Sequence, residues 1–229
     1  MSTDDHHAFG WQPTIDTVLE HPLSGVERRR TRVAIGFLVV FVGLFAVSYA
    51  GSVLTINGEA LETLTERFDM VSTVLIALAA AAVTIVPFLY ATWNGGPALS
   101  FTLPLVPVTL GHMAAGQYAL GLDTIIALTV GSAASALALF AADIRRTGSL
   151  RPWNTGHRDE SQLLFVTMLT VVAAVSASQF VAGAPPRSLE SYLPFSVLWL
   201  VPLGIVGAYW QAAIRTTVAA RLERGRSES

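Results

Sequence analysis

A small set of polar residues interrupts an otherwise apolar sequence, and these residues could carry chemistry. His112 lies inside a long hydrophobic run, Gln117 and Asp123 follow it, and Gln179 lies in a later run. An ionisable side chain inside a membrane-spanning segment is energetically costly, so His112 is a functional candidate by default. We predict an outward-facing polar pocket around His112, between the third, fourth and fifth runs, where the imidazole binds a solute or relays a proton.

The two ionisable residues of this set also have structural explanations. A neutral His112 imidazole is satisfied by one interhelical hydrogen bond, and the isolation of this histidine favours that interpretation. Asp123 stands at the predicted start of a helix, where a carboxylate caps exposed amides and complements the helix dipole. The sequence leaves the pocket and the structural interpretations open.

Established catalytic patterns are missing from the sequence. The chain has no cysteine and no lysine, which excludes disulfides, thiolate metal sites, cysteine nucleophiles and lysine Schiff bases. There is no H-E-x-x-H zinc motif, and no pair of aspartates inside the hydrophobic runs could hold magnesium. We therefore expect no cofactor and no metal, and interpret the protein as non-enzymatic. A metal-independent enzyme that uses His112 and Asp123 is the third alternative.

Six hydrophobic runs are long enough to cross a membrane. A spanning helix needs about 20 apolar residues to cross about 30 Å of hydrocarbon. Charged residues make up 13% of the chain, against about 25% in a typical soluble domain. The sequence predicts an all-α integral membrane bundle of six transmembrane helices. The six runs cover residues 33–56, 70–92, 98–118, 124–142, 162–182 and 193–214.

This organisation divides the chain into three parts. Residues 1–32 form a tail that we interpret as carrying an interfacial helix, with a disordered tail as the alternative. Residues 33–214 form the transmembrane domain, and residues 215–229 form a basic tail. The arginine-only, alanine-rich composition suggests a prokaryotic, halophilic archaeal source.

The arginines lie almost entirely on one side of the six runs. All 14 basic residues are arginine, and twelve of them lie in the two tails and the loop after the fourth run. Positive charge marks the cytoplasmic side, so we predict a multi-pass protein of the cell membrane with both termini cytoplasmic. No aromatic-interleaved basic domain accompanies these arginines, so nucleic acid is not a predicted partner. The arginines expected to contact anionic lipid head groups are Arg28, Arg29, Arg30, Arg145 and Arg146.

Prolines indicate where the helices should be irregular. Pro104 and Pro107 should break or kink the third run, and Pro202, with Gly204, should bend the sixth run near its middle. Broken helices often build transport sites, although many ordinary spanning helices also contain proline. The freed carbonyls need partners in protein or water, so the third run should pack inside the bundle.

Two features suggest partner contacts. Ala127, Gly131 and Ser135 recur at four-residue spacing, which predicts close internal helix packing, with oligomer contact as the alternative. The loop at residues 143–161 is the best exposed surface for a membrane or cytoplasmic protein partner. The leading interpretation is therefore a non-enzymatic membrane subunit or scaffold. The alternative is a solute-binding or transport protein with a pocket around His112.

Overall fold

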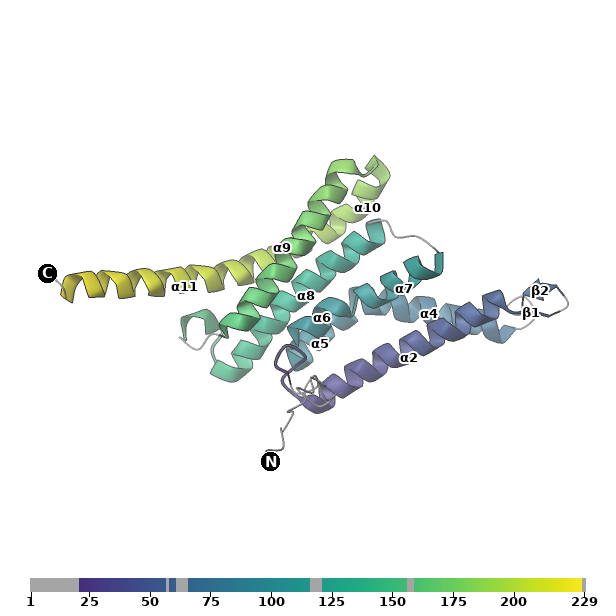
Figure 1. The fold of residues 1–229 in the computed structure, drawn as a ribbon, viewed down its shortest axis with the longest axis horizontal. Helices are drawn as coiled ribbons and strands as arrows, with labels where there is room; N and C mark the ends of the chain where they lie inside the picture. Colours follow the sequence, from purple (N-terminus) through teal and green to yellow (C-terminus); the bar gives the residue numbers. More distant parts are fainter. Residues whose placement is uncertain (1–20, 57, 61–65, 116–120, 156–158, 228–229) are drawn as a thin grey trace, which may run out of the picture.

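The chain folds into an almost entirely helical bundle (Figure 1). The computed structural model describes residues 21–227 apart from 57, 61–65, 116–120 and 156–158. The interfacial helix predicted in the first tail falls in residues 1–20, outside this described part. The helices are α2 (Arg28–Val53), α4 (Glu66–Thr84), α5 (Val86–Asn94), α6 (Pro97–Thr102), α7 (Leu105–Ala115), α8 (Leu122–Thr147), α9 (Glu160–Gly183), α10 (Pro186–Ser196) and α11 (Leu200–Ser227).

The predicted all-α class is confirmed, and the described residues contain five or six helical segments that are long and apolar enough to span a membrane. Five helical segments are long and apolar enough to cross a membrane, and α4 and α5 together make a sixth that is bent by 53°. Two 3₁₀ turns, Pro152–Asn154 and Val197–Trp199, join longer helices. A short antiparallel hairpin of β1 (Thr55–Ile56) and β2 (Glu59–Ala60) connects α2 toward α4.

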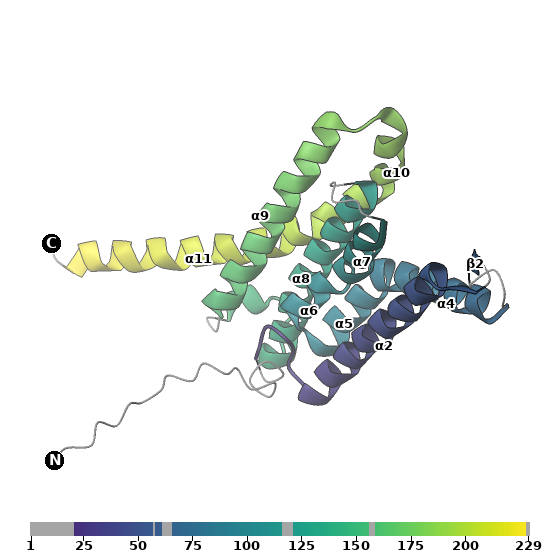
Figure 2. The same ribbon diagram turned by 45° about the vertical axis from the view of Figure 1, so that its right-hand side comes forward.

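Helix α8 forms the centre of the bundle. It packs against α4, α5, α6 and α7 as well as α9, α10 and α11, and 72% of its most apolar window is buried. The corresponding window of α2 is only 11% buried, as expected for a helix that faces lipid over most of its surface. Figures 1 and 2 show α9 and α4 on different sides of α8.

The small residues of α8 pack inside the bundle, as predicted. Ala127, Gly131 and Ser135 are all buried. A Cβ added at Gly131 would lie 2.7 Å from the backbone oxygen of Phe101 on α6. Glycine therefore allows the α6 and α8 backbones to approach closely, which leaves this face unavailable for contact with another copy.

The predicted break in the third run is confirmed, and a break in the second run was missed. Helix α6 ends at Thr102 and α7 begins at Leu105, so the interruption falls at Pro104. The second run bends between Thr84 and Val86 because Pro87, which has no N–H, cannot donate to the carbonyl one turn earlier. The second span is therefore sharply bent, and the third is interrupted by a turn within one apolar segment.

The sixth run has no helix break at Pro202 and Gly204, where a bend was predicted; its irregularity is a 3₁₀ turn near its start. The irregular turn is Val197–Trp199, before Pro202 and Gly204, which both lie within α11. Pro202 occupies the first turn of α11, where a missing N–H removes little hydrogen bonding. The sixth apolar segment is also longer than predicted, because helical structure extends from Pro186 to Arg224 across this turn.

The arginine-bearing helix ends gather at one end of the molecule, here named the arginine end. It comprises the start of α2 and the end of α8, which carry the arginines, together with the end of α5 and the start of α9, which carry none (Figures 1 and 2). The guanidinium groups of Arg30 and Arg145 both donate to the backbone carbonyl of Trp93. Helix α11 leaves the bundle on the same side and extends beyond it (Figure 2).

Candidate functional site

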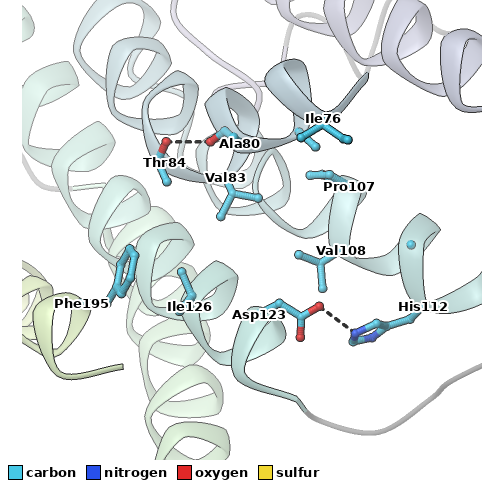
Figure 3. Close-up of a pocket in the computed structure, with 12 residues that line it drawn as sticks. Ile76, Ala80, Val83, Thr84, Pro107, Val108, His112, Asp123, Ile126 and Phe195 are labelled. Atoms are coloured by element: carbon cyan, nitrogen blue, oxygen red, sulfur yellow. Dashed lines mark hydrogen bonds and ion pairs between the residues drawn. The ribbon is translucent and has the colours of Figure 1, made fainter. Parts of the chain in front are cut away.

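An apolar cavity of about 630 Å³, open along much of its surface, lies beside the first turns of α8 (Figure 3). Its walls come from the second half of α4, from α7, from the start of α8 and from one residue of α10. Its volume falls within the range of about 300–1,000 Å³ that is typical of small-molecule sites. The lining residues are Ile76, Ala79, Ala80, Val83, Thr84, Pro107, Val108, Gly111, His112, Asp123, Ile126 and Phe195.

The two broken spans shape this cavity. The α4 residues that line it are those immediately before the bend at Ile85. Thr84 ends α4, and its Oγ1 donates to the Ala80 carbonyl at 2.6 Å, so this hydroxyl is already satisfied. On α7, Pro107, Gly111 and their neighbours share one helical face after the break at Pro104.

The polar part of the cavity is a hydrogen-bonded pair, His112 and Asp123. The distance from His112 Nε2 to Asp123 Oδ2 is 2.9 Å. The His112 side chain is 21% exposed and that of Asp123 is 56% exposed, counting surface open to lipid or water. Figure 3 shows the pair at one side of the cavity, with the aliphatic side chains of α4 opposite. The second ring nitrogen of His112 and the remaining lone pairs of Asp123 can therefore form hydrogen bonds with a bound molecule.

Asp123 also stabilises the start of α8, but it is not the N-cap residue that the sequence predicted. Gly121 occupies the N-cap position of α8. Asp123 lies in the first turn, and its Oδ1 accepts a hydrogen bond from the backbone N–H of Thr124 at 2.9 Å. A carboxylate in this turn is stabilised by the helix dipole. The two oxygens thus divide their roles between the helix start and His112.

The structure brings together two of the four residues expected in the pocket. His112 and Asp123 meet, whereas Gln179 lies exposed on α9 and does not line the cavity. Gln117 lies outside the described residues. The expected wall from the fifth span is replaced by α4 and Phe195, because α9 packs on another side of α8.

No family model, curated protein or solved structure matches this chain. The chemistry of the cavity therefore follows from its lining. Within the described parts of the chain, no three His, Asp or Glu side chains are grouped as metal ligands would be. Thr84 is the single hydroxyl-bearing residue among the described lining residues, and it donates to a backbone carbonyl.

A second polar region, at the arginine end, was not predicted. The Asn94 side chain is fully buried, accepts a hydrogen bond from the Glu27 N–H at 2.9 Å, and donates to Thr31 Oγ1 and Tyr90 Oη. A Cβ added at Gly25 would lie 2.0 Å from Asn94 Nδ2, so the segment before α2 packs tightly on this amide. The Asn94-Gly-Gly-Pro sequence indicated a turn but gave no sign of this network.

Asp143 is a buried carboxylate at the same end. Its side chain is 2% exposed, its Oδ2 accepts a hydrogen bond from the Tyr209 hydroxyl at 2.6 Å, and its Oδ1 lies 3.5 Å from Arg146. The sequence placed Asp143 at the start of an exposed loop. Burial results because α11 crosses α8 here and covers the carboxylate with Tyr209.

Proposed function

We propose that this protein is a multi-pass membrane protein that binds a largely apolar, lipid-like molecule in the α4–α7–α8 cavity. The observation that carries the proposal is a single polar pair, His112 and Asp123, in an otherwise apolar wall. Ligand sites typically combine a hydrophobic lining with a few polar groups that fix orientation. The pair would hold the polar group of the ligand, and the aliphatic wall would bind its hydrocarbon.

The broken helices support a binding or transport role over a purely structural one. The breaks at Pro104 and before Pro87 belong to the two spans that line most of the cavity. In transporters, discontinuous helices frequently surround the substrate site. The near absence of charge in the described lining favours a neutral or amphiphilic solute over an ion-coupled one.

A cavity-filling substitution tests this proposal. Gly111 lines the cavity and has open space where a Cβ would lie, so Gly111→Leu adds apolar volume without a clash. Gly207 on α11 also has open space but does not line the cavity, so Gly207→Leu is the matched control.

The protein is extracted with its native lipid, and small molecules released on denaturation are identified by mass spectrometry. We expect one compound enriched over bulk lipid, lost in Gly111→Leu and His112→Ala, and kept in Gly207→Leu. Identical profiles for all variants would reject the proposal.

A membrane subunit or scaffold is the second candidate, and the projecting end of α11 favours it. From Arg215 to Arg224, α11 is exposed and extends beyond the bundle (Figure 2). The loop first considered for this role is partly occupied, because Trp153 stacks on Phe140 at 5.9 Å between ring centroids. Native mass spectrometry of full-length protein and of a chain truncated after Arg215 separates these roles. A stoichiometric protein lost on truncation would support the subunit role, and a lone full-length protein would oppose it.

We further propose that the arginine end faces the cytoplasm of a cell membrane, with both termini on that side. The support is the arginine asymmetry, which is the usual determinant of orientation. Because the chain has no cysteine, single-cysteine labelling is clean. Leu150→Cys, where Leu150 is 78% exposed, should react only from the cytoplasm, and Thr55→Cys in the hairpin only from outside. The reverse pattern would overturn the orientation.

A further inference from the structure

A groove at the arginine end has the features of a binding site that is separate from the cavity. It lies between the segment before α2, the end of α8 and the start of α9, and its volume is about 330 Å³. Both cationic and apolar residues line it. The lining residues are Pro22, Gly25, Val26, Ala142, Arg145, Arg146 and Gln162.

The groove contains two arginines, and one of them, Arg145, has no carboxylate partner among the described residues. Arg145 Nη1 donates to the backbone carbonyls of Thr92 and Trp93 at 3.0 and 2.8 Å, and no carboxylate of the described residues forms an ion pair with Arg145. Arg146 lies 3.5 Å from Asp143, and its side chain is 43% exposed. Guanidinium groups carry five N–H donors in a fork that matches phosphate oxygens, so both arginines keep donors for a ligand.

Gln162 supplies a second, independent observation. Its exposed fraction is only 3%, and its Oε1 is buried with no hydrogen-bond partner. The backbone N–H of the same residue donates to Asp159 Oδ1 at 3.1 Å, which fixes the start of α9. Buried polar atoms are nearly always paired, so an unpaired acceptor beside a cationic groove points to a ligand with a hydrogen-bond donor.

We propose that this groove binds the phosphate of an anionic phospholipid whose head group carries a hydroxyl. The phosphate would bind between Arg145 and Arg146, and the head-group hydroxyl would donate to Gln162 Oε1. Val26 and Ala142 provide an apolar edge for the glycerol backbone and the first acyl carbons. The groove lies where α8 ends and α9 begins, which is the level of the head groups if these helices span the membrane.

This site differs from general attraction of arginines to anionic lipid. Of the five arginines expected at head groups, only Arg145 and Arg146 line the groove. Arg30 instead pairs with Glu27 at 2.6 Å and lies over the Trp93 ring. The proposal does not depend on the cavity at the other end of α8, so substitutions here should leave binding in that cavity unchanged.

Lipid retention in native mass spectrometry tests the site. The full-length protein is released from nanodiscs of phosphatidylcholine with phosphatidylglycerol or with phosphatidylethanol, which has the same charge but lacks head-group hydroxyls. We expect one retained phosphatidylglycerol, with retention reduced roughly tenfold in Arg146→Gln, because a charge-assisted hydrogen bond is lost. Arg151→Gln removes an equal charge outside the groove and should change retention little. Equal losses in both variants would indicate nonspecific attraction and overturn the proposal.

A second variant keeps the test decisive if loss of Arg146 perturbs the fold around Asp143. Gln162→Met removes the unpaired oxygen at similar volume, and Gln211→Met is the control at an exposed glutamine of α11. Gln162→Met should lower the retention of phosphatidylglycerol to the level observed for phosphatidylethanol. The retention of phosphatidylethanol itself should not change. Wild-type retention that is equal for the two lipids, or an unaffected Gln162→Met, would refute the hydroxyl contact.

A further experiment distinguishes a lipid phosphate from the phosphate of a soluble molecule. Glycerol 3-phosphate is added to protein in nanodiscs of phosphatidylcholine alone. Binding that is abolished by Arg146→Gln and preserved in Arg151→Gln would support the phosphate site with a soluble ligand. Absence of binding by both glycerol 3-phosphate and phosphatidylglycerol would overturn the phosphate assignment.

Discussion

The two ends of α8 use polar residues in opposite ways. At the arginine end, the carboxylate of Asp143 is buried and bonded to Tyr209. At the other end, the carboxylate of Asp123 is 56% exposed and borders a cavity. Both residues belong to one helix, and both have a basic partner. The difference lies in what packs around them, since α11 covers Asp143 whereas α4 and α7 leave space beside Asp123.

This contrast separates structure from binding. Polar groups that are saturated by partners within the chain stabilise the fold and have little capacity left for a ligand. The His112–Asp123 pair keeps exposed surface and faces a space of ligand size. Substitution of a saturated group at the arginine end, such as Asn94, should therefore reduce stability most, and substitutions at the cavity end should reduce binding in the cavity most.

The largest loss of stability is expected for Asn94→Ala. The fully buried side chain joins Glu27, Thr31 and Tyr90 through three hydrogen bonds, and its removal leaves buried partners unpaired. We expect a decrease of about 3 kcal/mol in the free energy of unfolding, measured by reversible unfolding in mixed micelles. Thr92→Val is the control, since the exposed Thr92 hydroxyl donates only to carbonyls of its own helix. A loss no larger than that of the control would contradict the difference between the ends.

The next largest loss of stability is expected at Gly131, which lies between the two ends of α8. A Cβ there would lie 2.7 Å from the Phe101 backbone oxygen, so Gly131→Ala should force α6 and α8 apart. We expect a loss of about 1–3 kcal/mol. Gly43→Ala is the control because nothing lies within 4 Å of its added Cβ. If both variants unfold at the same denaturant concentration, α6 and α8 are not in close contact.

A smaller, pH-dependent effect is expected at Asp159, the N-cap of α9. Partial burial raises the pKa of Asp159, but hydrogen bonds from Ser161 and Gln162, together with the charge of Arg146, hold the pKa below its ordinary value. A lowered pKa means that the stabilisation is present above the ordinary aspartate pKa and is lost as pH falls through the folded-state value. Asp159→Ala should cost about 1 kcal/mol at neutral pH, and almost nothing once Asp159 is protonated. A cost that does not change with pH would contradict this origin.

The smallest effect on stability is expected at the cavity. A partly exposed hydrogen-bonded pair contributes about 1 kcal/mol or less, so His112→Ala and Asp123→Asn should unfold nearly as the wild type does. The same variants should lose the bound small molecule. A large loss of stability with retained ligand would assign the pair to the fold and would reverse the contrast between the ends.

The sequence predicted what depends on local pattern. The membrane class followed from the lengths of the apolar runs, and the break at Pro104 from proline chemistry. His112 and Asp123 were also predictable as neighbours, since a short connection joins their helices. The bend before Pro87 carried the same proline signal inside an apolar run and could have been found.

Other features depend on long-range packing that a single sequence does not encode locally. From the sequence, Gln179 is expected at about the same membrane depth as His112. It does not reach the pocket because α9 packs on another side of α8. Asp143 and Asn94 lie at helix ends, where polar residues are ordinary. Only the crossing of α11 and the folding back of the segment before α2 bury them.

Photo-crosslinking from inside the cavity tests the central claim most directly. A benzophenone amino acid replaces Val108, which lines the cavity, or Val171, which is 55% exposed on α9. After irradiation in native membranes, the mass of each adduct is measured. We expect one dominant small-molecule adduct at position 108 and a spread of bulk lipids at position 171. The same bulk-lipid distribution at both positions would contradict a specific ligand in the cavity.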